Sequence, residues 1–343
     1  MDKILSVIIP TYNMEKYLHK CLNSLLVSDK SLFDQLEVLV INDGSKDSSS
    51  EIAHEYQNQY SSVFRVIDKE NGNYGSCINR GLLEATGKYV KVLDADDSFS
   101  VDAFEIYLSE LQHTDADLVL SDLVMVDEYD KITWQSSYKD GPEYMPVRLK
   151  FDFCSYINRP DVDYYGMMHG FAYRREILIE NGYVQIEGRP YTDQQWVFEP
   201  IRYVKTAYYV DVNLYNYLVG REGQTVSSVN MVKSVDNLIF MVEKLFSLYE
   251  AGLSEYKKYY LRQVRVQLEF LYKKGIIEDA YPIDKLVKLD KEIQHIPDIN
   301  SLLNSFRYYK VPYVIEWRRH TYLRTAYMVY CIKWLKVLLG KPV

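Results

Sequence analysis

The chain has 343 residues, of which 48% are hydrophobic and 26% are charged, and its formal net charge is −8 at pH 7. This negative charge argues against general binding to nucleic acids, and no uncharged apolar run approaches the roughly 20 residues that cross a bilayer. The length allows two domains, or one large domain with an appendage. Because a strand is predicted to begin within four residues of the start and the four cysteines form no C-x-x-C pair, we expect a reduced cytoplasmic protein without a signal peptide or a cysteine-bound zinc.

The first hundred residues alternate short apolar, β-branched runs with segments in which apolar residues recur at helical spacing. Strands that alternate with helices predict a parallel sheet covered on both faces. The helix at 47–60 contains Ser48-x-x-Glu51, which predicts a capping box at its start. Strands are expected at 4–9, 36–41, 63–67, 89–93 and 117–121, and helices at 15–27, 47–60 and 74–85.

The pattern changes after the fifth strand. Residues 127–165 contain turn signals rich in glycine and proline, so we expect irregular structure there. From about residue 232 to the end, the periodicity is mainly helical. We therefore expect an α/β domain over residues 1–228 and a helical region over residues 229–343.

Four loops follow the predicted strands, and each is rich in polar or small residues. In open α/β sheets, ligands bind at the carboxyl ends of the strands, near the point where the strand order switches. The sequence therefore predicts a ligand site among these loops, which cover residues 10–13, 42–45, 71–75 and 94–97.

The loop Asp94-Ala95-Asp96-Asp97 directly follows an apolar, buried strand. Residues two apart in an extended chain point the same way, so Asp94 and Asp96 would face one side together. Two carboxylates on one side repel each other unless a cation lies between them. A divalent metal that carries a diphosphate is a natural occupant, because hard cations prefer oxygen ligands. A solvated acidic turn is the alternative.

Four motifs follow one another along the first hundred residues: V-I-I-P-T-Y-N at 7–13, D-G-S-K-D at 43–47, the block from Asn71-Gly72 to Tyr89, and D-A-D-D at 94–97. In this order they resemble the family-2 glycosyltransferases, whose catalytic domain has the GT-A fold, a Rossmann-like mixed sheet with helices on both faces. The resemblance covers roughly residues 4–125. It implies a donor-nucleotide half over residues 1–100 and an acceptor half over 101–228.

The resemblance implies a role for each loop. Tyr12 would stack on a nucleobase, and Asp43 would accept a hydrogen bond from uracil; the alternatives are a packing tyrosine and an Asx-turn or helix cap. Asp94 would contact the ribose or sugar of the donor, and Asp96 would ligate a Mn²⁺ or Mg²⁺ ion that bridges the diphosphate. Asp47 is instead predicted to be structural. The expected donor-binding residues are Pro10, Thr11, Tyr12, Asp43, Gly72, Asn79, Asp94, Ala95 and Arg221.

The general base is expected in Tyr191-Thr192-Asp193-Gln194-Gln195-Trp196, which resembles the later acidic motif of the family. Asp193 is the candidate that would deprotonate the acceptor hydroxyl; its alternative role is to cap the following helix. The sequence departs from many relatives here, because Thr192 stands where they carry glutamate. Trp196 and His169 are expected to line the acceptor site.

Two further segments carry open alternatives. Residues 217–227 look like a loop of related bacterial enzymes in which Arg221 reaches a phosphate; a surface hairpin turn is the other interpretation. Residues 305–343 hold eight Lys and Arg against Glu316 alone, interleaved with aromatic residues. This basic tail either lies on the inner face of an anionic membrane, near a lipid-linked acceptor, or docks on protein, including a second subunit of a homodimer.

The predicted function is metal-dependent, inverting transfer of a hexose or N-acetylhexosamine from a UDP-sugar to a hydroxyl of a glycan or lipid-linked glycan, in bacterial polysaccharide biosynthesis. A sugar nucleotidyltransferase is one alternative, although residues 10–13 lack the glycine-rich, basic loop that it needs. A non-catalytic glycan-binding protein on the same scaffold is the other. The retained acidic residues argue against it.

Overall fold

The computed structural model of the chain describes residues 2–139, 144–221, 234–251, 254–278, 280–308 and 310–319, together with Trp334 and Leu338. The chain divides into two compact units. The sheet unit comprises Met1–Gln224 with Leu253–Tyr259, and the helical unit comprises Thr225–Gly252 with Tyr260–Val343. Among the described helices, none combines the length and the apolar character that crossing a membrane requires.

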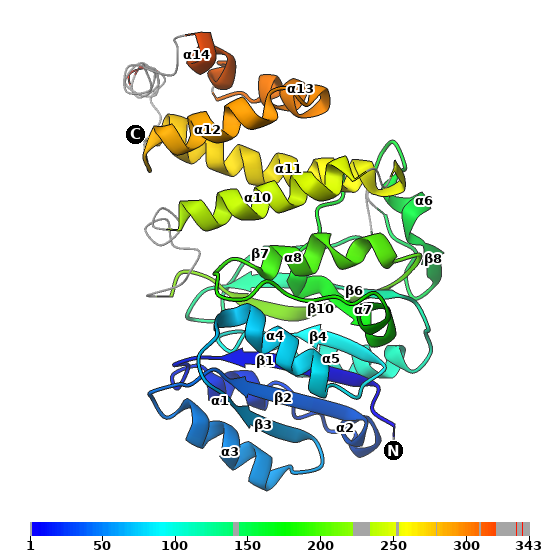
Figure 1. Cartoon of the computed structure of the whole chain (residues 1–343). Helices are drawn as coiled ribbons and strands as arrows, with labels where there is room; N and C mark the ends of the chain where they lie inside the picture. Colours follow the sequence, from blue (N-terminus) through cyan, green and yellow to red (C-terminus); the bar gives the residue numbers. More distant parts are fainter. Residues whose placement is uncertain are drawn as a thin grey trace. The chain divides into compact units, whose positions relative to one another are not determined.

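Four parallel strands form one half of the sheet. β1 (Leu5–Thr11) lies between β2 (Leu36–Asn42) and β4 (Tyr89–Val92), and β3 (Phe64–Asp68) lies outside β2. Every residue of β2 is buried, as expected for a strand covered on both faces. The chain leaves β1 toward β2 and returns to β4 on the other side of β1 (Figure 1), so the strand order switches between β1 and β4.

The other half of the sheet is mixed in direction. β9 (Phe171–Arg174) runs antiparallel to both β4 and β6 (Leu118–Val126), whereas β10 (Thr206–Leu218) runs parallel to β6. The predicted mixed α/β sheet is therefore confirmed. In the described part of the chain the sheet has ten strands, which include β5 (Ser98–Phe99) and β8 (Lys150–Asp152), both paired with β10, and β7 (Ile132–Gln135), paired with β6.

Alternate side chains of β1 point to opposite faces of the sheet, and helices cover both faces. Val7 and Ile9 belong to one hydrophobic core with residues of α1 (Leu18–Asn23), α3 (Ser49–Gln59) and α5 (Val101–Leu111). Ile8 points the other way, toward α4 (Asn73–Glu84). A Cβ on Gly81 of α4 would lie 2.5 Å from the Ile8 side chain, so glycine allows the helix to approach the strand closely. Other helices of this unit are α2 (Lys30–Asp34), α6 (Phe153–Ile157), α7 (Arg175–Glu180), α8 (Asp193–Phe198) and the 3₁₀ turns η1 (Met168–Gly170), η2 (Pro200–Tyr203) and η3 (Ser254–Tyr256).

The cap of α3 differs from the prediction. Ser48 makes no capping hydrogen bond through its side chain, so the predicted capping box is wrong. Asp47 instead accepts hydrogen bonds from the Ser49 backbone N–H at 3.0 Å and from the Ser49 hydroxyl at 2.6 Å. Although burial opposes it, these hydrogen bonds and one from Glu15 lower the pKa of Asp47. A charged carboxylate is the stronger acceptor, and it replaces the serine hydroxyl at this helix start.

Two segments differ from the predicted elements. The helix expected at 15–27 is shorter, because α1 ends at Asn23. The Ser24 hydroxyl donates to the Cys21 carbonyl at 2.6 Å and accepts from the Phe99 N–H at 3.0 Å, and the following residues continue in tighter i→i−3 turns. Residues 127–165, expected to be irregular, contain β7, β8 and α6, so that expectation is also wrong.

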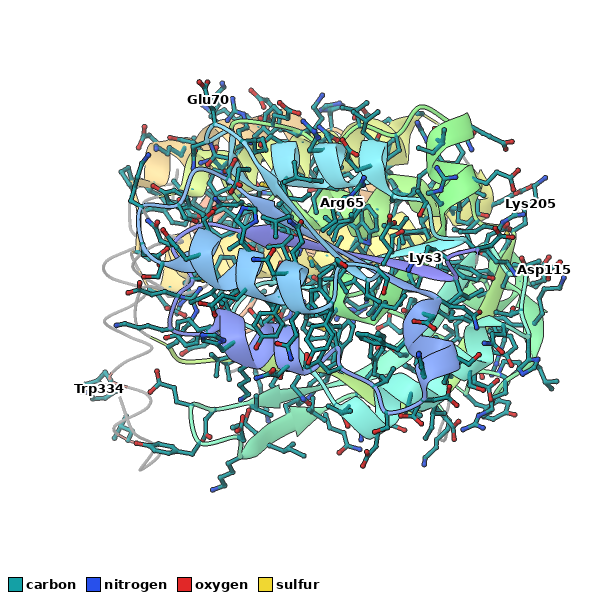
Figure 2. All side chains as sticks on the ribbon, turned by 90° about the horizontal axis from the view of Figure 1, so that it is seen from below. Lys3, Arg65, Glu70, Asp115, Lys205 and Trp334 are labelled. Atoms are coloured by element: carbon teal, nitrogen blue, oxygen red, sulfur yellow. The ribbon has the colours of Figure 1, made fainter. Side chains whose placement is uncertain are left out.

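The loops that precede the strands and those that follow them lie at opposite ends of the sheet. Glu70 follows β3, whereas Asp115 and Lys205 precede β6 and β10, and Figure 2 shows Glu70 far from the other two. At the amino end of β1, the Lys3 ammonium donates to three backbone carbonyls at 2.7–3.0 Å. At this end of the sheet, Lys3 therefore serves to join backbone segments. The polar loops of the predicted site gather at the carboxyl end.

A buried ion pair joins helices of the helical unit. Asp290 of α12 (Ile283–Ile293) is fully buried, and Arg318 of α14 (Tyr313–Arg319) approaches its carboxylate at 2.7 Å. The Tyr272 hydroxyl donates to the same carboxylate at 2.5 Å. These contacts join three helices through a single charge. The other elements of this unit are α10 (Val235–Glu250), most of α11 (Lys257–Tyr272), a π-helical turn at Lys273–Ile277 and α13 (Pro297–Ser305).

The first part of the predicted basic tail belongs to this packed unit. Trp317 is only 1% exposed, Arg318 binds Asp290, and Arg319 pairs with Glu316 at 2.9 Å. These residues dock within their own unit. Beyond Arg319, only Trp334 and Leu338 are among the described residues, so membrane contact by the tail stays a prediction.

We expect Arg318→Met to lower the free energy of unfolding by about 3–5 kcal/mol, because the Asp290 carboxylate would stay buried without its counter-charge. Urea denaturation followed by circular dichroism measures this loss. Arg319→Met is the matched control, since that side chain is 69% exposed and its surface pair is worth about 0–1 kcal/mol. Equal losses for the two variants would contradict the role given to Arg318.

Candidate active site

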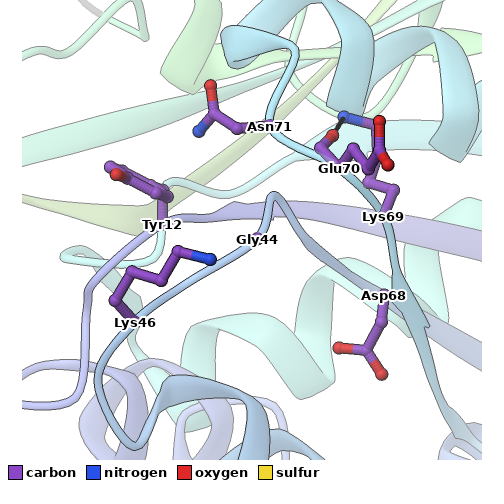
Figure 3. Close-up of a pocket in the computed structure, with 7 residues that line it drawn as sticks. All are labelled: Tyr12, Gly44, Lys46, Asp68, Lys69, Glu70 and Asn71. Carbon is purple, nitrogen blue, oxygen red and sulfur yellow. Dashed lines mark hydrogen bonds between the residues drawn. The ribbon is translucent and has the colours of Figure 1, made fainter.

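A pocket opens where β1, β2 and β3 end. Tyr12, 46% exposed, forms one wall beside Lys46, and Lys69 and Glu70 lie across from them (Figure 3). The pocket has a volume of about 500 Å³ and is also lined by Gly44, Asp68 and Asn71. The accessible ring suits a flat aromatic ligand, and Lys46 adds a positive charge beside it.

Asp43 lies next to this pocket and is almost fully buried, at 3% exposure. Its carboxylate forms an ion pair with the Lys69 ammonium and accepts a hydrogen bond from the Gly72 N–H at 2.9 Å. Gly44 follows with φ of +73°, a left-handed conformation that favours glycine. The predicted donor residues Asp43 and Gly72 are thus in direct contact, and Lys69 is a partner that sequence reasoning missed.

The acidic loop after β4 is tied to the far strand β10. The Asp94 N–H donates to the Tyr215 hydroxyl at 3.1 Å, and that hydroxyl donates to Asp97 Oδ2 at 2.8 Å. The Leu218 N–H donates to Asp97 Oδ1 at 2.8 Å. Burial, together with the charges of the neighbouring aspartates, raises the pKa of both Asp94 and Asp97. Asp97 therefore anchors the loop.

Asp96 and Arg221 bind each other. The Arg221 Nε donates to Asp96 Oδ2 at 2.6 Å, and the two side chains are only 11% and 12% exposed. The guanidinium lies 5.3 Å from the ring centre of Tyr17, within the range of a cation–π contact. The sequence predicted a metal on Asp96 and a phosphate on Arg221, and the structure brings these two residues together. The remainder of the predicted loop, from residue 222 on, lies outside the described residues.

His169 completes a group that can hold a cation. Ligand atoms of Asp94, Asp97 and His169 all lie within 4.8 Å of one another. Asp94 Oδ1 and His169 Nδ1 are buried and have no hydrogen-bond partner in the described part of the chain. Burial first, and then the charge of Lys91, lower the pKa of His169 to about 3, so the imidazole is neutral and keeps a free lone pair. The donor set of two carboxylates and one imidazole fits Mn²⁺ or Mg²⁺, with the nitrogen favouring Mn²⁺.

Asp193 is the first residue of α8, and Thr192 is the N-cap residue. The Thr192 side chain makes no capping hydrogen bond, and Asp193 does not occupy the N-cap position, so the alternative role of Asp193 as the N-cap residue is not observed. Burial raises the pKa of Asp193, although Gln194 Nε2 donates to its carboxylate at 3.1 Å. Its charge also contributes, after burial and Asp96, to the raised pKa of Asp94. Asp193 therefore lies close to the acidic loop.

Three tyrosines around these acids were missed by sequence reasoning. The Tyr74 hydroxyl donates to Met168 Sδ at 3.4 Å, and burial, followed by the charges of Asp94 and Asp193, raises its pKa. Tyr217 lies 4.4 Å from His169 between ring centres, and burial and four aspartates raise its pKa. The third is Tyr215, which bridges Asp94 and Asp97. The Tyr215-x-Tyr217 spacing near the end of a strand was a usable signal, because residues two apart share a face.

Several predicted residues have other surroundings. Trp196, expected at the acceptor site, is only 1% exposed, because its side of α8 faces the core. Its ring packs edge-on against Tyr173 and Tyr183, at 5.3 and 5.8 Å between ring centres. Asn79 holds a neighbouring loop by donating to the Gln185 carbonyl at 2.9 Å. Two more predicted donor residues, Thr11 and Ala95, are buried. The Thr11 hydroxyl donates to the Ile9 carbonyl at 3.1 Å, and Ala95 is 2% exposed. Pro10 is partly exposed at the end of β1.

The chain is similar to known proteins in both sequence and fold. The family model described as Glycosyl transferase family 2 matches residues 6–182, more than half of the chain. The Escherichia coli protein named uncharacterized glycosyltransferase YibD is 26% identical over 92% of this chain and 94% of its own length. The glycosyltransferase GlyG of Streptococcus pneumoniae is 34% identical over 131 residues, which are 38% of this chain and 42% of that protein.

Solved structures share the fold. TarS of S. aureus, solved in complex with UDP-GlcNAc, superposes with a TM-score of 0.59 at 18% identity, over 88% of this chain and 81% of that one. The mannosyltransferase PcManGT of Pyrobaculum calidifontis, solved with GDP-Man and Mn²⁺, gives a TM-score of 0.54 at 15% identity, over 92% and 86% of the two chains. The GT-A fold expected from the sequence is therefore confirmed.

We expect Asp94→Asn to stabilise the ligand-free protein at pH 8 by about 1–2 kcal/mol, with a smaller gain at pH 5. Burial, Asp96 and Asp193 raise the pKa of Asp94, so ionisation of Asp94 costs folding free energy that increases as the pH rises above the ordinary carboxyl range. Urea unfolding at the two pH values measures the difference. The exposed Glu128 offers a control, and a Glu128→Gln variant with the same pH-dependent gain would refute the assignment.

Proposed function

Because this chain belongs to glycosyltransferase family 2, we propose that it transfers a sugar from a UDP-sugar to a hydroxyl group of a glycan acceptor, with inversion at the anomeric carbon. One observation carries the proposal. Acidic side chains gather where β4 ends, at the same edge of the sheet as the pocket of Tyr12, Lys46 and Lys69: ligand atoms of Asp94, Asp97 and His169 lie within 4.8 Å of one another, and the charge of Asp193 acts on Asp94. A donor bound with its base in that pocket would extend its diphosphate toward the acidic loop.

The donor is proposed to bind in two parts. Tyr12 would stack on the nucleobase, and Asp43 would accept a hydrogen bond from it, with Lys69 orienting that carboxylate. Lys46 and Arg221 would supply positive charge for the diphosphate. The solved complexes of TarS with UDP-GlcNAc and UDP support a uridine nucleotide as the donor. Because PcManGT was solved with GDP-Man, guanosine donors should be tested beside them.

A divalent cation is proposed to lie at Asp94, Asp97 and His169. When bound, such an ion would act as a Lewis acid that offsets the charge of the departing diphosphate. The Mn²⁺ in the PcManGT complex supports this assignment for a protein of the same fold. Asp96, the ligand predicted from the sequence, would join the ion only after it separates from Arg221.

Asp193 is proposed to be the general base. It would take the proton of the acceptor hydroxyl as that oxygen attacks C1 of the sugar. The new C1–O bond would form on one face while the bond from C1 to the diphosphate oxygen breaks on the other, and UDP would leave. Burial raises the pKa of Asp193, which makes it a stronger base than an exposed carboxylate. The glycan or lipid-linked glycan acceptor would enter from the side of α8, on which Asp193 is the first residue.

We expect Asp193→Asn to reduce transfer by about 10²–10⁴-fold while UDP affinity stays unchanged, because the amide cannot accept the proton. A panel of UDP-sugars with glycan acceptors, followed by UDP release, measures transfer, and calorimetry measures UDP binding. Glu180→Gln, at an exposed position on α7, is the control. Retained transfer in Asp193→Asn would move the base elsewhere. Pyrophosphate release by the unaltered chain would point to a nucleotidyltransferase instead.

We also expect Tyr12→Ala to weaken UDP binding roughly tenfold, because stacking of a base on an aromatic ring contributes about 1–3 kcal/mol. Calorimetric titration with UDP measures the change. Tyr129→Ala removes a ring that is 89% exposed and is not part of the pocket lining, and it should leave the affinity unaltered. Unchanged binding in Tyr12→Ala would place the base outside this pocket.

A further inference from the structure

Lys91 is a fully buried lysine in the middle of β4, three residues before the acidic loop. Its ammonium donates to the backbone carbonyl of His169 at 2.7 Å and approaches that of Phe171 at 3.4 Å. Within the described residues, no carboxylate lies within ion-pair distance of Lys91. Burying a charge without a counter-ion costs several kcal/mol, whereas an apolar side chain would fill the same space without that cost. The presence of a lysine at this buried position therefore needs an explanation.

Three aromatic rings surround the same ammonium. The ring centres of Phe99, Tyr107 and Tyr215 each lie 5.9 Å from Nζ, so cation–π contacts replace part of the lost hydration. Tyr215 is also the residue whose hydroxyl joins Asp94 and Asp97, and it packs edge-on against His169 at 4.7 Å. Lys91 thus contacts the ring of Tyr215 and the backbone carbonyl of His169, two residues that lie beside Asp94 and Asp97.

We propose that Lys91 is a positioning residue of the active site: by binding the His169 and Phe171 carbonyls and the face of Tyr215, it fixes the His169 imidazole against Asp94 and Asp97. Lys91 touches neither the donor nor the acceptor. Its effect passes through η1, whose short 3₁₀ turn carries His169 at its centre. The position of the His169 ring is inferred from these contacts alone. The importance of that position for catalysis rests on the proposed function, because His169 is a proposed ligand of the cation.

The direct test is histidine-ring NMR on the full chain without ligands. The chain has six histidines, and loss of one signal in His169→Gln assigns that of His169. The spectra of all variants are compared at one pH, because burial lowers the pKa of both His169 and Lys91. Lys91→Met should shift the His169 ring signals while the other five stay in place. An unmoved His169 signal in folded Lys91→Met would overturn the proposal.

Tyr107→Phe is the matched control. It keeps the ring beside Lys91 and removes a buried hydroxyl that has no hydrogen-bond partner among the described residues, so His169 should not shift. If Lys91→Met does not fold, Lys91→Gln takes its place. Failure of both variants to fold would make Lys91 a requirement of the fold rather than a positioning residue, and would also overturn the proposal.

A second readout uses Mn²⁺ alone, followed by electron paramagnetic resonance of the free ion. Loss of a residue that orients a ligand typically weakens metal binding about 10–100-fold, and we expect Lys91→Met to fall in that range while Tyr107→Phe matches the unaltered chain. The outcomes separate the two proposals. An unaltered chain that binds no Mn²⁺ and releases no UDP refutes the proposed function, whereas the NMR shift still decides the role of Lys91.

Discussion

The crowding of carboxylates at the end of β4 sets the demands that the rest of the site meets. Asp94, Asp96 and Asp97 lie within four residues, and Asp193 adds its charge from α8. Repulsion and loss of water both disfavour the ionised forms, which is why the pKa values of Asp94 and Asp97 are raised. The neighbouring groups offset this cost in different ways. Tyr215 and the Leu218 N–H donate hydrogen bonds to Asp97, and Arg221 provides a full positive charge to Asp96.

Much of this support comes from β10, which begins more than 100 residues after the acidic loop. The mixed half of the sheet explains how it arrives there. β9 inserts antiparallel between β4 and β6, and β10 runs parallel to β6, so the end of β10 returns to the same side as the loops after β1 and β4. The parallel half provides the pocket lined by Tyr12, Lys46 and Lys69. The mixed half provides His169, Tyr215 and Tyr217 to the acids.

The parallel strands and the four loops could be predicted because each is written in a continuous stretch of sequence, such as the apolar run before Asp94. Contacts between distant segments could not. The Asp96–Arg221 pair joins residues 125 positions apart, and Lys69 reaches Asp43 only because β2 and β3 are neighbours. The burial of Trp196 could not be predicted for a related reason, because its place in the motif does not reveal which side of α8 faces the core. The cap of α3 depended on a competition between adjacent polar residues that spacing alone does not decide.

The ion pair between Arg221 and Asp96 means that the ligand-free cleft carries its own counter-ion. An incoming cation that is to reach Asp96 competes with a tethered guanidinium, so its apparent affinity falls by the fraction of molecules in which the pair is closed. Under the proposed function, a diphosphate would shift that balance, because it would offer the arginine a second anionic partner. Nucleotide and cation would then be coupled reciprocally at this position, each making room for the other by releasing one half of the same contact.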